Sequence, residues 1–150
     1  MKKKEVRCGV GVALFWEDKI LLQLRSDNKK WGFIGGNVEF GETLQEACER
    51  ETKEETGLIL DTDDLIFVHN IYDSPITNIV EYPEVLVHKI DILFICLLCE
   101  VPVLKLNEES VSLEFFNFDM LPSSEEVSPQ ARQALQDAIY TYLTIYRGMN

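Results

Sequence analysis

Positive charge is scarce in this sequence. Of 150 residues, 14 are Lys or Arg and 26 are Asp or Glu, which gives a formal net charge of −12. Proteins that bind nucleic acid without regard to sequence need a basic surface to contact the phosphates. We therefore expect no nucleic-acid partner. A small anionic substrate is still compatible with this charge if a metal ion and a few basic side chains concentrate positive potential locally.

Long hydrophobic runs, low-complexity segments and internal repeats are also absent from the sequence. No apolar run reaches the roughly 20 residues that a transmembrane helix needs, so we expect no membrane partner. Residues 1–16 faintly resemble a signal peptide, but Glu5 and Arg7 interrupt the transition to apolar residues and no cleavage site is evident. The length suits one domain with a sizeable core, which we expect to cover residues 1–150.

Cysteine and histidine are few, and their spacing offers no Ser-His-Asp or Cys-His arrangement. Cys96 and Cys99 have CxxC spacing, but residues 90–98 have strand composition, and strand residues three apart point to opposite faces. We expect the cysteines to pack in the core of a protein from a reducing, cytoplasmic compartment, rather than to bind zinc. His69 and His88 stand alone in strand patterns, which favours structural roles.

Residues 44–56 lie between a helix start signal and a helix stop signal. Thr43 and Glu46 have the spacing of a capping box, in which each side chain accepts a hydrogen bond from the other residue's backbone. Gly57 suits the left-handed position that follows many helices, and Leu58 supplies the apolar contact found there. The sequence therefore predicts a helix from Leu44 to Thr56.

One face of this predicted helix begins apolar and becomes acidic. At about 100° per residue, a single stripe contains Leu44, Cys48, Glu51 and Glu55. Carboxylates clustered near a core repel one another and lose solvation, so they need compensating charge. Arg50 supplies one positive group, and a hard divalent cation such as Mg²⁺ would complete the balance. The alternative is an acidic face that is merely solvated, as most runs of glutamate are.

The segment from Gly36 to Leu58 resembles the Nudix box, whose pattern is G-x5-E-x7-R-E-U-x-E-E-x-G-U with U aliphatic. Thr52 departs from the pattern at a usually aliphatic position, and Ile34 replaces the proline that usually precedes the two glycines. Looser resemblance to the MutT/Nudix type extends over most of the chain. The residues that match the box are Gly36, Glu42, Arg50, Glu51, Glu54, Glu55, Gly57 and Leu58.

The order of the expected elements, strands and helix followed by strands and helix, indicates an α+β fold. The resemblance sharpens this to the Nudix fold, a mixed β-sheet sandwiched between α-helices. Residues 84–100 have strand composition over a length that is unusual for one strand, so we expect a bend or loop in their first half. Ser128 and Pro129 predict the N-cap and first residue of a second helix. Expected strands cover residues 6–16, 20–25, 65–72, 89–98 and 111–118.

Gly9 and Gly11 face the same side of the first expected strand. Glycine within a strand indicates that another group approaches the backbone closely. Packing against a neighbouring element is the favoured explanation, and a bound nucleotide is the alternative.

The resemblance implies a Mg²⁺- or Mn²⁺-dependent pyrophosphohydrolase. The metal would be held by the carboxylates of Glu51, Glu54 and Glu55 and by the carbonyl of Gly36. Glu51 is the candidate general base, although this role migrates within the family. Arg50 would orient the glutamates through charge-assisted hydrogen bonds.

Residues outside the box are also implicated by the resemblance. An arginine at the end of the second strand often contacts substrate phosphate in this family, which points to Arg25 and less directly to Lys29 or Lys30. Some members recruit a further glutamate as base or metal ligand from the region before or within the late strand. The candidates are Glu108, Glu109 and Glu114.

The resemblance leaves the substrate open between nucleoside triphosphates, oxidised or ordinary, and ADP-ribose. Pro75 lies 17 residues after the box, near the position where relatives that cleave ADP-ribose carry a proline. A small-molecule nucleotide is thus the expected partner, together with a second copy of the chain, because the family is often dimeric. The alternative from another class is a Nudix-fold regulator that binds nucleotides without turnover.

Overall fold

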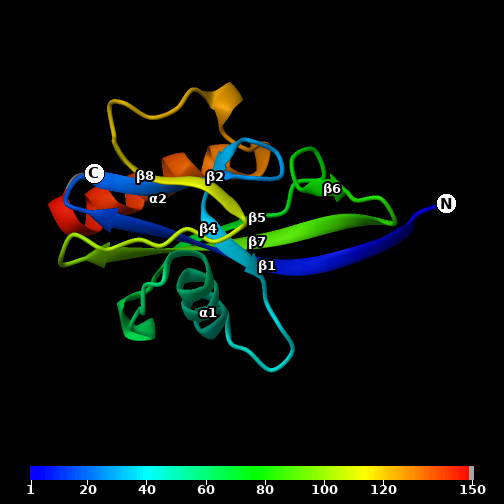
Figure 1. Ribbon diagram of the computed structural model, residues 1–150, viewed down its shortest axis with the longest axis horizontal. Coiled ribbons are helices and arrows are strands. Elements are labelled where there is room, and N and C mark those ends of the chain that lie inside the picture. Colours follow the sequence, from blue (N-terminus) through cyan, green and yellow to red (C-terminus); the bar gives the residue numbers. More distant parts are fainter. Residues whose placement is uncertain (149–150) are drawn as a thin grey trace.

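The structure is a computed structural model that describes residues 1–148, so positions 149 and 150 of the expected domain lie outside it. Within these residues, an eight-stranded sheet has helix α1 on one face and helix α2 on the other (Figure 1). Short 3₁₀ helices cover Thr62–Asp64, Ser124–Glu126 and Pro129–Ala131. The longer elements are β1 (Lys3–Trp16), β2 (Lys19–Arg25), β3 (Trp31–Gly32), β4 (Ile34–Asn37), α1 (Leu44–Thr56), β5 (Ile66–Tyr72), β6 (Ile79–Glu81), β7 (Val85–Leu98), β8 (Ser110–Asn117) and α2 (Arg132–Arg147).

Strand β1 is the centre of the sheet. It runs parallel to β7 and antiparallel to β2 and β4. Beyond these neighbours, β2 pairs with β3 and β8, and β7 pairs with β5 and β6. The sheet is therefore mixed and covered by helices on both faces, which confirms the predicted α+β architecture.

The expected bend in the first half of β7 is wrong. The strand is continuous over 14 residues, and β1 pairs with it in parallel register from Lys3 opposite Val85 to Trp16 opposite Leu98. On its other edge, β6 pairs with residues 86–88. Because both edges of this half have hydrogen-bonding partners, the strand continues where its composition alone suggested an interruption.

The core has one part on each face of the sheet. On the α2 side, Phe15 and Leu93 pack with Tyr142, and the rings of Phe15 and Tyr142 stack with centroids 4.3 Å apart. On the α1 side, Val12 and Ile34 pack with apolar residues of α1. This division follows the alternation of β1, whose successive side chains point to opposite faces.

Gly9 and Gly11 are packing positions, as favoured from the sequence. A Cβ atom at Gly9 would lie 2.5 Å from Oδ1 of Asp91, and one at Gly11 would lie 3.2 Å from Cδ1 of Leu93. Both neighbours belong to β7. The small residues of β1 therefore leave room for side chains of the adjacent strand.

The second helix begins later than predicted. Pro129–Ala131 form a turn of 3₁₀ helix, and α2 starts at Arg132. The Ser128 side chain makes no capping hydrogen bond, so its predicted role as the N-cap of an α-helix is wrong. The backbone of Ser128 instead donates from its N–H to the carbonyl of Trp31 over 2.8 Å, which fixes this turn against β3.

All four cysteines are free thiols. Cys48 and Cys96 are buried in the core on the α1 side, as expected, whereas Cys99 lies exposed just beyond β7. Burial raises the pKa of Cys48 to about 12, which keeps this thiol protonated and unreactive. Among the described residues, no helix is both long and apolar enough to cross a membrane.

The capping box of α1 is formed as predicted. The backbone N–H of Glu46 donates to Oγ1 of Thr43 over 3.1 Å, and the N–H of Thr43 donates to Oε1 of Glu46 over 2.9 Å. At the other end, Gly57 has φ of 80° and donates its N–H to the carbonyl of Lys53. Both helix boundaries thus coincide with the predicted ones.

We expect Thr43→Ala to lower the free energy of unfolding by about 1 kcal/mol, because it removes the acceptor of a helix N–H group. Chemical denaturation followed by circular dichroism measures this loss. Thr43→Ser is the matched control, since it keeps the hydroxyl and should stay close to the parent protein. Equal stability of the Ala and Ser variants would show that the cap contributes nothing.

Candidate active site

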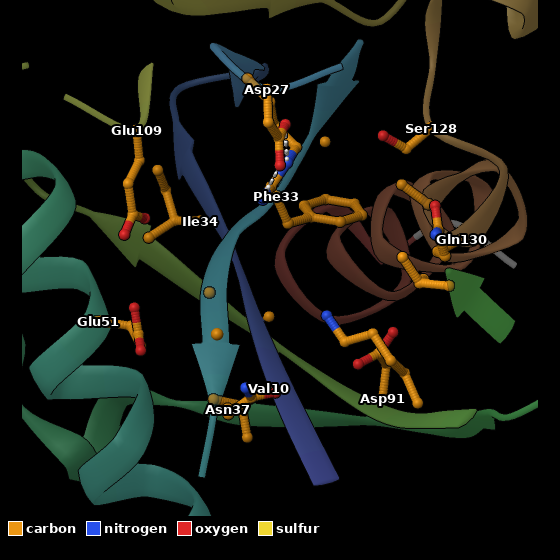
Figure 2. Close-up of a pocket in the computed structure, with 18 of the residues that line it drawn as sticks. Val10, Asp27, Phe33, Ile34, Asn37, Glu51, Asp91, Glu109, Ser128 and Gln130 are labelled. Atoms are coloured by element: carbon orange, nitrogen blue, oxygen red, sulfur yellow. Dashed lines mark hydrogen bonds and ion pairs between the residues drawn. The ribbon is translucent and has the colours of Figure 1, made fainter. Parts of the chain in front are cut away.

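A cavity of about 910 Å³ opens beside β4, the short strand that precedes α1. Its walls come from β1, the β2–β3 loop, β4, α1, β7, the segment before β8 and the start of α2. Figure 2 shows Glu51, Glu109 and Ile34 on one side of β4, and Phe33, Asp91, Gln130 and Ser128 on the other. The cavity therefore has two chemically different sides.

Two glycines of β4 allow α1 and β1 to approach this strand. A Cβ atom at Gly36 would lie 2.4 Å from Oε1 of Glu51, and one at Gly35 would lie 2.0 Å from the carbonyl oxygen of Val10. Ile34, which replaces the family's usual proline, is fully buried and pairs with Val12. Pairing with β1 therefore holds the segment without the proline ring.

Arg50 is the positive centre of the acidic helix face. Its guanidinium donates to Glu42 over 2.6 Å from Nε, to Glu51 over 2.8 Å from Nη1, and to the carbonyl of Asn37 over 2.9 Å. A longer contact of 3.4 Å reaches Glu54. Glu42 holds Arg50 in place, and this ion pair keeps the pKa of Glu42 below its usual range.

Glu55 is the most buried carboxylate of the cluster, with 1% of its surface exposed. It accepts hydrogen bonds from the backbone N–H of Gly35 over 2.9 Å and from Nε2 of Gln23 over 3.2 Å. Burial raises the pKa of Glu55 to about 8, and the neighbouring carboxyls of Glu109 and Glu51 contribute to the rise. Burial also raises the pKa of Glu51, against the lowering effect of Arg50.

The segment before β8 brings Glu109 to this cluster. This segment is fixed to the end of α1, where the Lys105 N–H donates to the carbonyl of Thr56 over 2.9 Å. It is also fixed to the β2–β3 loop, where the Ser26 N–H donates to the carbonyl of Glu109 over 2.9 Å. Glu108 and Glu109 both line the cavity. Glu114 lies exposed in β8 opposite Leu22, and does not line it.

Arg25 ends β2 and lines the cavity, and its contact with substrate phosphate stays a prediction. Its guanidinium is held by the Asp27 carboxylate through contacts of 3.0 Å and 2.9 Å. Lys29 and Lys30 do not line the cavity, because their ammonium groups donate to the backbone carbonyls of Ser26 and Glu125. Of the three basic residues, the structure places only Arg25 beside the cavity.

In residues 1–148, no three acidic, histidine or cysteine side chains already stand together in the arrangement of a metal site. Glu51 and Glu54 are turned toward Arg50, and Glu55 is turned toward Gln23 and Gly35. The donors themselves are hard oxygens on one helix face, which suits Mg²⁺ or Mn²⁺. Burial raises the pKa values of Glu51 and Glu55, and at Glu51 the Arg50 guanidinium offsets part of this rise.

Some residues of the site do not follow from the sequence analysis. Gln23, which donates to Glu55, lies in the apolar run of β2, and Asp91, which lines the cavity, lies in the apolar run of β7; a single polar residue within such a run is a signal for both. Ser128 was interpreted as a helix cap, and Phe33 was not considered. The alternation of polar and apolar residues points to Gln23 and Asp91, whereas the positions of Ser128 and Phe33 at the cavity depend on the tertiary fold.

The sequence pattern of the NUDIX domain matches residues 6–138. An ADP-ribose pyrophosphatase of Methanocaldococcus jannaschii is 38% identical over 109 residues, which are 71% of this chain and 59% of that protein. This chain therefore spans little more than half of that relative.

Solved structures show the same fold. A MutT/nudix family protein from Enterococcus faecalis has a TM-score of 0.74 at 17% identity, over 91% of this chain and 62% of that one. An ADP-ribose pyrophosphatase from Streptococcus suis has a TM-score of 0.59 at 26% identity, over 93% and 92% of the two chains.

The buried carboxyl of Glu55 should make the stability of the metal-free protein depend on pH. Its pKa is raised from 4.5 to about 8, so the folded state retains a proton that the unfolded chain loses. Stability should then fall as pH rises through this interval. Thermal unfolding in the presence of a chelator measures the effect.

In the same experiment, Glu55→Gln should flatten the pH dependence, because the amide does not titrate and the unpartnered Oε1 of Gln23 offers it an acceptor. Glu49→Gln on the same helix is the control and should keep the parent slope. Equal slopes in the parent protein and Glu55→Gln would contradict this account of Glu55.

Proposed function

This chain is a member of the Nudix family, and from that premise we propose that it hydrolyses the pyrophosphate bond of a nucleoside diphosphate linked to a second group. The observation that carries the proposal is a cluster of three carboxyls: Glu51 and Glu109 line one side of a large cavity, and the buried Glu55 lies beside them. Buried acids that lack sufficient positive charge are a suitable site for a divalent cation and a diphosphate.

Bound by Glu51, Glu54, Glu55 and the carbonyl of Gly36, a Mg²⁺ or Mn²⁺ ion would neutralise the diphosphate and lower the pKa of a water molecule. Glu51 is the candidate to take the proton of that water, and two observations support this role: it lines the cavity, and burial raises its pKa. Arg50 holds the Glu51 carboxylate by a contact of 2.8 Å.

Arg25 supplies a phosphate contact at the mouth of this side. Its present partner Asp27 has 63% of its side chain exposed, and such an exposed ion pair is worth about 1 kcal/mol or less. A substrate phosphate can therefore replace Asp27 as the partner of Arg25 at small cost. A planar guanidinium binds phosphate through two parallel hydrogen bonds, which orients the group as well as attracting it.

ADP-ribose is the substrate we propose first, because the relatives from M. jannaschii and S. suis are both named ADP-ribose pyrophosphatases. Nucleoside triphosphates, ordinary and oxidised, are the other class. Pro75 does not help to choose between them, since it lies exposed between β5 and β6 and does not line the cavity. A panel of these substrates assayed with Mg²⁺ tests the proposal.

Cleavage of at least one member of the panel supports the proposed function. Tight binding across the panel without cleavage would favour a nucleotide-binding regulator instead, and would overturn the proposal. Association with a second copy of the chain stays a prediction, whichever result the substrate panel gives.

Glu54→Gln should reduce Mg²⁺-dependent turnover by roughly two orders of magnitude or more, because it removes a charged oxygen ligand. The fold should survive, since 56% of the Glu54 side chain is exposed and its one ion pair is 3.4 Å long. Steady-state rates and the melting temperature measure the two effects. The matched control is Glu49→Gln, and near-parental turnover of Glu54→Gln would remove Glu54 from the site.

Two of the three late glutamates, Glu109 and Glu114, can be separated by the same assay. Glu109→Gln should lower the rate by about tenfold or more and raise the Mg²⁺ concentration needed for half-maximal activity, because Glu109 lies beside Glu55. Glu114→Gln should leave both quantities unchanged, since its side chain is exposed away from the cavity. Equal effects of the two substitutions would contradict the assignment of Glu109.

A further inference from the structure

The side of the cavity opposite Glu51 takes no part in the chemistry described above. Its wall contains the ring of Phe33, the carboxylate of Asp91, the hydroxyl of Ser128 and the amide of Gln130 (Figure 2). These four residues come from the segment before β4, from β7 and from the turn before α2. We refer to them as the inner wall.

Asp91 is held in one orientation. Nδ2 of Asn78 donates to its Oδ2 over 3.0 Å, and the same amide nitrogen is anchored on the carbonyls of Tyr72, over 2.8 Å, and Lys89, over 3.2 Å. Asn78 is 1% exposed, so this support is rigidly packed. The other oxygen, Oδ1, lies over Gly9, where a Cβ atom would come within 2.5 Å of it.

Oδ1 of Asp91 is therefore a fixed acceptor on the cavity wall, and no hydrogen bond within residues 1–148 reaches it. Burial raises the pKa of Asp91, while the charge of Lys89, which lines the same cavity, lowers it. Asp91 is followed in the same row of β7 by the apolar side chains of Leu93 and Ile95, and a carboxylate beside them costs stability unless a partner uses it.

Ser128 gives a second, independent indication of a ligand. It is 5% exposed, and its Oγ has no hydrogen-bond partner among the described residues. Its backbone is fixed by the bond to Trp31, so the hydroxyl stays at the cavity wall. Buried hydroxyls are nearly always hydrogen-bonded, so an unpartnered one beside a cavity indicates a missing partner.

Phe33 supplies the flat surface between these polar groups. Its side chain is half-buried, packs on the α2 side of the sheet and borders the cavity. An aromatic ring flanked by a fixed acceptor and a free hydroxyl is suited to a planar heterocycle, because stacking and edge hydrogen bonds act together.

We propose that the inner wall binds a 6-aminopurine nucleotide, with Phe33 against the base, Oδ1 of Asp91 accepting a hydrogen bond from the exocyclic amino group and the Ser128 hydroxyl bonding to another polar group of the same nucleotide. The proposal deepens the proposed function, from which it takes only that the ligand is a nucleotide. Guanine presents two neighbouring N–H donors and is best read by both oxygens of a carboxylate. Asn78 already occupies Oδ2, which leaves one acceptor and favours a single amino group.

The test compares the binding of AMP and IMP by calorimetry in the presence of a chelator, so that no turnover is involved. The two ligands differ only at the base: AMP has a 6-amino donor beside the acceptor N1, and IMP has a 6-oxo acceptor beside the donor N1–H. The parent protein should bind AMP about tenfold or more tightly than IMP, which corresponds to the discrimination of one well-placed base contact. Equal affinities in the parent protein would overturn the proposal.

Asp91→Asn should reverse this preference. The new side chain must present its carbonyl to Nδ2 of Asn78, so its amide N–H₂ group faces the base in place of Oδ1. A donor at this position repels the 6-amino group and attracts the 6-oxo group. Asp119→Asn is the matched control, since it removes the same charge from an exposed turn outside the cavity and should leave the ratio of the two affinities unchanged.

Ser128→Ala provides a second route if Asp91→Asn fails to fold. It should weaken the binding of AMP by about fivefold or more without lowering the melting temperature, because the removed hydroxyl has no partner in the described protein. A purely structural serine would leave AMP binding unchanged, and that result would overturn its assignment.

The remaining outcomes separate the base subsite from its rivals. If Asp91→Asn weakens AMP and IMP equally, Asp91 contacts a ribose hydroxyl and the base assignment is overturned. If the parent protein cleaves ADP-ribose but shows no AMP preference, the inference fails and the proposed function stands. If it prefers AMP as expected but cleaves no member of the substrate panel, the inference stands and the proposed function fails.

Discussion

The close approach of α1 to β4 is the constraint on which the rest of the site depends. Gly36 leaves room for the Glu51 carboxylate at this point, because a Cβ atom on residue 36 would come within 2.4 Å of Oε1 of Glu51. The same approach brings the Glu55 carboxylate to the backbone N–H of Gly35. Two carboxylates of α1 are thus positioned against β4, and any side chain at Gly36 would displace the Glu51 carboxylate.

That contact also explains the electrostatics of the cluster. Carboxylates pressed against a strand lose water, and the pKa values of Glu51 and Glu55 are raised by this burial. Arg50 offsets only part of the cost, because its guanidinium is shared between Glu42, Glu51 and the carbonyl of Asn37. The fold therefore holds an unfavourable concentration of negative charge at the cavity, and such a cost is expected at a functional site rather than in a purely structural region.

The sequence predicts the parts of this design that are local or have fixed spacing. Thr43, Glu46 and Gly57 act within a few residues, so the boundaries of α1 follow from them. The length of β7 does not follow from nearby residues, because it depends on hydrogen-bonded pairing with the separate strands β1 and β6. Ser128 shows the same limit, since whether its hydroxyl caps a helix or faces a cavity is decided by the turn that docks on Trp31.

The two sides of β4 together decide what kind of molecule fits the cavity. One side holds carboxylates and Arg25 for a metal-bound diphosphate, and the other holds a ring, a fixed acceptor and a free hydroxyl. A ligand that used only the first side would leave the Ser128 hydroxyl unpartnered and the half-buried Asp91 carboxylate with Oδ1 unused. A ligand with a charged group at one end and a planar polar group at the other satisfies both. Specificity therefore depends on residues outside the motif that identifies the family, on the opposite side of a four-residue strand.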